Sequence, residues 1–270
     1  MIKDLILKIL SLLLSFITLV SSTVNASENI EYENEEAEPE MIAEPLDILP
    51  GNHMETYTDA ETGEYLDYWL FVPEGATTNM PLIIFLHGDG EVNELMTLQN
   101  FAMIKQAKEF YGENFPFIAI SPCTRTYSWI KGNIPITLKG LIDSVIDTCS
   151  IDIDRVIITG HSRGAIGVWH MIDMYSGFFA AAVPVSCDSE SPITVANCVN
   201  TPIWGFVGGG DYYDYGINMQ NLAAQINKLG GNARITVLDS CTHGGTKDAA
   251  YTIETFEWML AQTRIKDDGI

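Results

Sequence analysis

The chain has 270 residues, of which 47% are hydrophobic and 19% are charged. This apolar content is enough to bury a sizeable core, so the composition excludes an intrinsically disordered protein. The formal net charge is −22, and because a surface of that sign repels phosphate backbones, binding to nucleic acid is excluded as well. The length fits one large domain or two small ones.

Residues 1–26 have the features of a secretory signal peptide. Lys3 and Lys8 precede an apolar stretch over residues 9–20, and Val24 and Ala26 place small residues at the −3 and −1 positions of a cleavage site after Ala26. The alternative is a retained membrane anchor, but this stretch is shorter than the ~20 residues that a helix needs to cross a bilayer. We therefore predict a secreted protein without a stable membrane anchor after cleavage.

An acidic segment follows the predicted signal peptide. Residues 27–50 contain eight Glu, one Asp and three Pro, and no basic residue. Such a composition favours a solvated, self-repelling chain. We predict a disordered linker over 27–50 and a single folded domain over 51–270.

The folded domain contains all five cysteines, namely Cys123, Cys149, Cys187, Cys198 and Cys241. An odd number leaves at least one of them unpaired in a monomer, so disulfides are permitted but not implied. The spacings include no C-x-x-C and no nearby His cluster, so we expect no metal site.

Apolar runs and helical periodicities alternate along the rest of the chain. An edge strand is expected at 65–72, and continuous apolar runs typical of buried strands follow. These runs lie at 81–86, 117–120, 156–159, 180–185, 203–207 and 235–238, and helical patterns lie at 95–105, 138–146, 165–174, 219–229 and 252–261. The alternation predicts an α/β fold, with a mostly parallel sheet and helices on both faces. The short interval between 185 and 203 leaves no room for a large cap domain, so we expect an open site.

The sequence Gly160-His161-Ser162-Arg163-Gly164 lies between a predicted strand and a predicted helix. In that position the two glycines permit a sharp turn that exposes the Ser162 hydroxyl above the sheet. A serine hydroxyl is a weak nucleophile and requires a base, which an acid must orient. His243 and Asp211 each follow a later strand, at the edge where α/β sheets assemble their sites, and Asp214 is the rival acid.

Together these segments resemble the α/β-hydrolase family, in its secreted esterase, polyhydroxybutyrate-depolymerase-like and "predicted peptidase" branch. The matching segments are LHGDG at 86–90, SPC at 121–123, SW at 128–129, DRVIITGHS at 154–162, FAAAVPVS at 179–186 and PIW at 202–204. The resemblance implies that Ser162 is the nucleophile, His243 the general base and then acid, and Asp211 the orienting carboxylate. It also implies that the backbone N–H groups of Asp89 and Arg163 form the oxyanion hole.

Aromatic residues on the predicted loops are candidates for binding substrate. Trp129 and Tyr212 are expected near the site, where they could bind an aromatic or sugar-linked acyl group, although exposed turn residues are an equal alternative. The histidines at 87, 161 and 170 are interpreted as packing, loop or surface groups.

The function predicted from the sequence is that of a secreted serine hydrolase, which forms an acyl-enzyme and needs no cofactor. Its substrate would be a small-molecule or polymer-linked carboxylic ester, such as an acyl group on plant polysaccharide. One alternative is a serine peptidase of the prolyl-oligopeptidase type. Another is a non-catalytic carbohydrate-binding or surface protein on a hydrolase scaffold.

Overall fold

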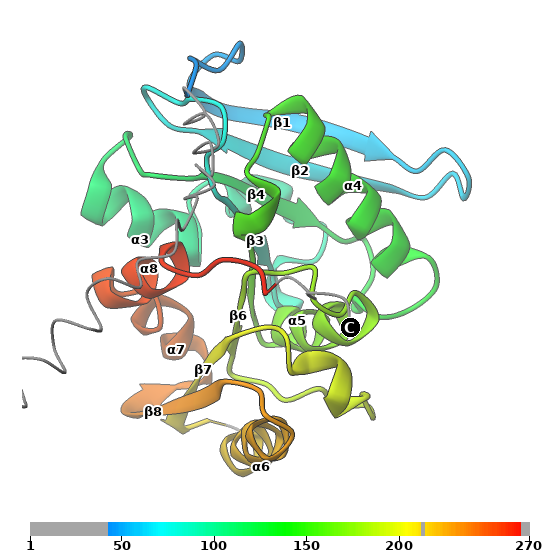
Figure 1. The fold of residues 1–270 in the computed structure, drawn as a ribbon, viewed down its shortest axis with the longest axis vertical. Helices are drawn as coiled ribbons and strands as arrows, with labels where there is room; N and C mark the ends of the chain where they lie inside the picture. The colour runs from blue at the N-terminus through cyan, green and yellow to red at the C-terminus, as the bar shows by residue number, and fades with distance from the viewer. Residues whose placement is uncertain (1–42, 212–213, 266–270) are drawn as a thin grey trace, which may run out of the picture. The chain divides into compact units, whose positions relative to one another are not determined.

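The computed structural model describes residues 43–211 and 214–265. Eight strands form one sheet in the order β1-β2-β4-β3-β5-β6-β7-β8 (Figure 1). The strands are β1 (Gly51–Thr58), β2 (Tyr65–Val72), β3 (Leu82–Leu86), β4 (Ile118–Cys123), β5 (Val156–His161), β6 (Ala181–Val185), β7 (Ile203–Gly210) and β8 (Ala233–Thr242). The pairs β1–β2 and β2–β4 are antiparallel, and all pairs from β4 to β8 are parallel.

Helices cover both faces of this sheet. The α-helices are α2 (Leu95–Leu98), α3 (Ala102–Tyr111), α4 (Ile134–Thr148), α5 (Arg163–Met174), α6 (Tyr215–Lys228), α7 (His243–Ala249) and α8 (Ile253–Leu260). Three 3₁₀ turns are η1 (Asp89–Glu91), η2 (Ile153–Arg155) and η3 (Val195–Cys198). In Figure 1, α3 and α8 lie on one side of the sheet, and α4 and α5 lie on the other.

The alternation of side chains along the buried strands divides the core into two layers. On β3, Leu82 and Ile84 pack in the same layer as the apolar faces of α4, α5 and α6. Their neighbours Ile83 and Phe85 point to the opposite face and pack with α3 and α8. A strand that is covered on both faces is apolar throughout, which is why these runs were recognisable. The predicted α/β class, with a mostly parallel sheet and helices on both faces, is confirmed.

The predicted edge strand at 65–72 is wrong in one respect. This strand is β2, and it lies inside the sheet between β1 and β4. The edge strand next to β2 is β1, which escapes sequence analysis because its segment GNHMETYT has partly or fully exposed residues and no alternating apolar pattern. Edge strands need little apolar surface, since one side of their backbone is left to solvent.

The predicted linker extends too far toward the domain. Thr78 N–H donates to Glu44 O, Leu46 N–H donates to Ala76 O, and Leu46 and Ile48 pack against the core. Residues from 43 onward therefore belong to the compact unit. The predicted signal peptide and the rest of the linker lie outside the described residues.

No cap domain interrupts the segment between β6 and β7, as predicted. Residues 186–202 contain only the short turn η3. The five cysteines, all within the described ranges, are free thiols. No helix in the described part of the chain is long and apolar enough to span a membrane.

Candidate active site

Ser162 lies at the sharp turn between β5 and α5. Its backbone has φ = 55° and ψ = −119°, a strained left-handed conformation for a residue with a side chain. The turn is possible because two glycines allow close packing. A Cβ on Gly160 would lie 2.7 Å from Gly164 C, and a Cβ on Gly164 would overlap Leu86 O. The helix therefore begins directly against the end of β3, and this contact fixes the position of the serine.

Three side chains from different strand ends come together in a hydrogen-bonded row. His243 Nε2 lies 2.9 Å from Ser162 Oγ, and His243 Nδ1 lies 2.5 Å from Asp211 Oδ1. His243 follows β8 as the first residue of α7, and Asp211 follows β7. The Asp211 side chain is only 3% exposed, whereas Asp214 is an exposed residue at the start of α6. Of the two carboxylates, Asp211 is therefore the one that pairs with His243.

His161 contacts the backbone of His243 through a hydrogen bond that sequence analysis missed. His161 is 6% exposed, and its Nε2 lies 2.9 Å from the backbone carbonyl oxygen of His243. Since a carbonyl only accepts, Nε2 carries the hydrogen. Burial lowers the pKa of His161 to about 4, so the ring is neutral at pH 7. The sequence placed His161 beside the serine but gave no sign of this partner, which is 82 residues away.

The loop between β3 and η1 approaches Ser162 from the other side. Gly88 lies so close that a Cβ there would be 3.3 Å from Ser162 Cβ. Its N–H donates to Glu91 Oε2 at 3.1 Å and is therefore already used. Asp89 is the first residue of η1 and Arg163 is the first residue of α5. Backbone N–H groups at the start of a helix lack intrahelical partners. The N–H groups of Asp89 and Arg163 are the two donors that the sequence resemblance named for the oxyanion hole.

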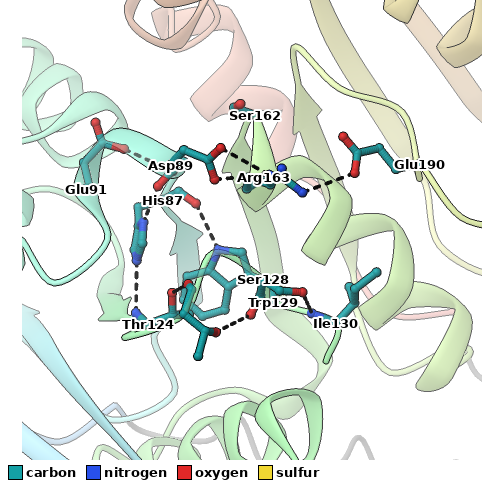
Figure 2. A network of polar contacts seen from close by, with 12 residues as sticks. His87, Asp89, Glu91, Thr124, Ser128, Trp129, Ile130, Ser162, Arg163 and Glu190 are labelled. Carbon is teal, nitrogen blue, oxygen red and sulfur yellow. Dashed lines mark hydrogen bonds and ion pairs between the residues drawn. The ribbon is translucent and has the colours of Figure 1, made fainter. Parts of the chain in front are cut away.

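The Asp89 carboxylate is compensated by a neighbouring cation. Arg163 Nε lies 3.1 Å from Asp89 Oδ1, and Arg163 Nη1 lies 3.3 Å from Glu190 Oε2 (Figure 2). All three side chains are substantially exposed. An unpaired carboxylate here would oppose a developing negative charge, and the pairing with Arg163 reduces that opposition.

The loop that begins with His87 is held in place by the segment after β4. Thr124 N–H donates to His87 Nε2 at 3.0 Å, so the ring hydrogen is on Nδ1, which donates to Gly88 O at 2.7 Å. Trp129 Nε1–H donates to His87 O at 2.9 Å (Figure 2). Burial lowers the pKa of His87 to about 4. The ring therefore stays neutral and keeps its acceptor nitrogen.

The predicted role of Trp129 in substrate binding is wrong. Trp129 is only 2% exposed, and it packs under the loop, against Gly167 of α5, instead of facing solvent. The exposed aromatic of this segment is Tyr127, with 66% of its surface accessible, and sequence analysis did not single it out. Tyr212, the other predicted substrate residue, lies outside the described residues.

A pocket of about 320 Å³ opens directly at the serine. It is lined by Gly88, Asp89, Gly90, Glu91, His161, Ser162, His243, Gly244 and Lys247. Ser162 and His243 thus line the same pocket as the loop that contains Asp89. Across the described ranges 43–211 and 214–265, no group of three or more His, Cys, Asp or Glu side chains is placed to hold a metal ion.

No known family model matches the chain. The chain is 26% identical over 168 residues to poly(3-hydroxyalkanoate) depolymerase C from Paucimonas lemoignei, a match that covers 56% of this chain and 40% of that protein. Among solved structures, a thermostable esterase superposes with a TM-score of 0.68 at 26% identity, covering 79% of this chain and 63% of the esterase. A feruloyl esterase module from Clostridium thermocellum, solved with sinapinate, superposes with a TM-score of 0.57 at 16% identity, covering 82% and 91%.

The chain thus spans less than two thirds of the length of the depolymerase and of the thermostable esterase. What these neighbours share with it is the arrangement of the sheet and helices. The order of the eight strands, the turn at Ser162 and the superposition on the esterases agree with one another. The chain is therefore an α/β-hydrolase by fold.

Proposed function

We propose that the chain is a secreted serine hydrolase that cleaves carboxylic esters by transferring the acyl group to Ser162. The observation that carries this proposal is the hydrogen-bonded row of Ser162, His243 and Asp211 at the mouth of a pocket. Such a row converts an ordinary hydroxyl into a nucleophile. The predicted signal peptide supports export, and the names of the relatives support an ester as substrate.

In the first half of the reaction, Ser162 Oγ attacks the ester carbonyl carbon while His243 Nε2 accepts the hydroxyl proton. Asp211 accepts a hydrogen bond from His243 Nδ1–H and stabilises the imidazolium that forms. The tetrahedral intermediate collapses, and His243 returns the proton to the departing alkoxide, which leaves as an alcohol. The acid part of the ester remains covalently attached to Ser162.

In the second half, water replaces the alcohol. His243 removes a proton from the water as it attacks the acyl carbon, and then returns a proton to Ser162 Oγ as the carboxylic acid leaves. In both halves the negative charge develops on the carbonyl oxygen. The backbone N–H groups of Asp89 and Arg163 are its donors, and the N-terminal end of α5 adds a favourable dipole.

The test is labelling with a fluorophosphonate, followed by peptide mapping. Wild-type protein should take up one label per chain at Ser162, and Ser162→Ala should take up none. Ser191→Ala is the matched control, because it removes a hydroxyl from the loop after β6 and should leave labelling intact. Hydrolysis of p-nitrophenyl acetate should follow the same pattern.

A panel of substrates separates the alternatives. Turnover of acetyl, butyryl or feruloyl esters without cleavage of peptides supports the proposal. Cleavage of peptides in preference to esters would replace it with the peptidase function. Failure of the folded wild-type protein to react with the fluorophosphonate would overturn it and favour a non-catalytic protein.

A further inference from the structure

A second pocket lies outside the Ser162 site, on the segment after β4. Its volume is about 370 Å³, within the usual range for small-molecule sites. We call it the loop pocket. Its lining includes Glu64, Thr126, Tyr127, Ser128, Lys131 and Asn133. None of these residues takes part in the row formed by Ser162, His243 and Asp211.

Residues that flank the loop pocket anchor its loop on two sides. On the side of β2, Arg125 Nη2 pairs with Asp67 Oδ2 at 2.7 Å, and its guanidinium lies 4.3 Å from the centre of the Tyr65 ring. On the opposite side, Trp129 donates to His87 O beneath the loop. Anchoring of the loop reduces the conformational entropy that is lost when a ligand binds, which favours affinity.

The loop also orders itself through its own hydroxyl groups. Thr124 Oγ1 donates to Thr126 O at 2.5 Å, Thr126 Oγ1 donates to Ser128 O at 3.0 Å, and Ile130 N–H donates to Ser128 Oγ at 3.3 Å. These contacts hold the turn without using the Tyr127 side chain. The Tyr127 ring therefore remains available on the surface, where it is 66% exposed.

The lining determines which class of ligand fits. Glu64 and Lys131 have opposite charges, so the pocket favours neither an anion nor a cation. The side chains offer both donors and acceptors, and Asn133 has both in one amide group. A ligand rich in hydroxyl groups can use both kinds of group, whereas a polyester chain has only acceptor oxygens along its length. The Tyr127 ring adds an apolar face against which the C–H face of a sugar ring can pack.

The position of the loop pocket suits a ligand attached to the reacting ester. β4 is two strands from β5 in the parallel part of the sheet, with β3 between them. Neighbouring strands are about 4.8 Å apart, so the carboxyl ends of β4 and β5 are separated by roughly 10 Å. The loop pocket lies beyond the end of β4, and Glu64, which precedes β2, is one strand farther from β5, so a small acyl group at Ser162 does not reach it. A chain of a few sugar units does.

We infer that the loop pocket binds a neutral carbohydrate chain that is part of the ester substrate, with Tyr127 as its stacking platform. This inference rests on the proposed ester hydrolysis at Ser162. It narrows the substrate class to esters that join an acyl group to an uncharged oligosaccharide or polysaccharide.

The test measures binding of carbohydrates that contain no ester, so that turnover is not needed. Xylotetraose, cellotetraose and a linear trimer of 3-hydroxybutyrate are titrated by calorimetry into the full mature protein carrying Ser162→Ala. At least one tetrasaccharide should bind with a stoichiometry of one, and the hydroxybutyrate trimer should not. Tyr127→Ala should weaken the tetrasaccharide Kd about tenfold, because the stacking face is lost. Tyr127→Phe, which keeps the ring, should change the Kd less than twofold.

The matched control is Phe110→Ala, which removes another exposed aromatic ring, from α3 on the other side of the molecule. It should not change the Kd. The inference is overturned if neither tetrasaccharide binds, if Tyr127→Ala binds as tightly as the parent protein, or if the trimer binds in a manner that depends on Tyr127. Circular dichroism of each variant separates loss of binding from loss of folding.

Failure of the inference and failure of the proposed function give different results. Wild-type protein that hydrolyses p-nitrophenyl acetate, while the Ser162→Ala protein binds no tetrasaccharide, retains the esterase function and loses the carbohydrate subsite. Protein that binds a tetrasaccharide through Tyr127 but hydrolyses no ester retains the subsite and loses the esterase function.

Discussion

The two sides of the Ser162 site are built in different ways. On the acid–base side, the groups proposed to act are side chains, and Asp211 and His243 contact each other directly at 2.5 Å. On the oxyanion side, the expected functional groups are backbone N–H groups, whose positions depend on the loop that begins with His87. The acid–base side thus depends on the types of its residues, whereas the oxyanion side depends on the contacts that position the loop.

Each side rests on a buried histidine, but the two histidines use their hydrogen bonds in opposite directions. His161 donates to the carbonyl oxygen of His243, whereas His87 accepts from Thr124 N–H. A protonated imidazole keeps its donors and loses its acceptor. Protonation of His161 would therefore keep its hydrogen bond to the His243 carbonyl oxygen. Protonation of His87 would break the hydrogen bond from Thr124 N–H.

The largest expected effect is on the acid–base side, from Asp211→Asn. The amide removes the negative charge that stabilises the His243 imidazolium and favours the wrong tautomer of the ring. The value of kcat for ester hydrolysis should fall about 10⁴-fold with little change in KM, measured by steady-state kinetics. Asp214→Asn is the matched control, and it should stay within about twofold of wild type. A greater loss for Asp214→Asn than for Asp211→Asn would reverse the assignment of the acid.

On the oxyanion side, His87→Leu should have a smaller but clear effect. It removes the acceptor for Thr124 N–H, so the loop that includes Asp89 shifts relative to Ser162. A shift of about 1 Å at a reacting group can cost up to about a hundredfold, so kcat should fall between tenfold and a hundredfold while KM stays nearly constant. His87→Gln, whose amide oxygen can accept the same hydrogen bond, should recover most of the rate. If Gln and Leu are equally poor, His87 only fills space.

The same contrast explains how much of the fold was predictable. The buried strands could be recognised because both faces of the sheet are covered, so an apolar run such as 82–86 has only one reasonable interpretation. β1 could not be recognised, because it is held mainly by backbone hydrogen bonds to β2, and those leave no apolar signature. The position of β2 inside the sheet was missed for the same reason.

The candidate site was predictable to a similar degree. Ser162, Asp211 and His243 could be predicted to lie together because each follows a strand and their residue types suit a hydrogen-bonded row. Trp129 was misplaced because the sequence does not show that Gly167 leaves space for its side chain or that His87 O accepts its N–H. Both of these contacts join residues far apart in the sequence. Tyr127, two positions away, has the exposure that was expected of Trp129.

Acid should destabilise the folded protein through the two buried histidines. In the unfolded chain a histidine has a pKa near 6.5, whereas burial lowers the pKa of His87 and of His161 to about 4. Between these values the unfolded state binds more protons, so the free energy of unfolding is fully retained above pH 6.5 and falls as the pH is lowered toward 4. The loss should be about 3 kcal/mol for each histidine.

Urea unfolding at pH 7.5 and at pH 4.5 measures this loss. His161→Gln and His87→Gln should each reduce the difference in the free energy of unfolding between the two pH values. His170→Gln, a partly exposed histidine on α5, is the control and should leave the difference unchanged. Equal pH dependence in wild type and in both variants would show that other groups cause the acid sensitivity.

The smallest effect is expected from the ion pairs of Arg163 at the mouth of the site. Arg163 and Glu190 are 40% and 39% exposed, and solvent screens such a pair, so Glu190→Gln should cost less than about 1 kcal/mol of stability. Differential scanning calorimetry in low salt should show a decrease in Tm of at most a few degrees, and 0.5 M NaCl should reduce the difference. A larger decrease that persists in high salt would mean that Glu190 holds the β6–β7 segment through contacts other than charge. The small expected cost follows from the comparison of the two sides, because exposed charges at the mouth contribute little, whereas the buried hydrogen bonds of His87 and His161 hold the groups that are proposed to react.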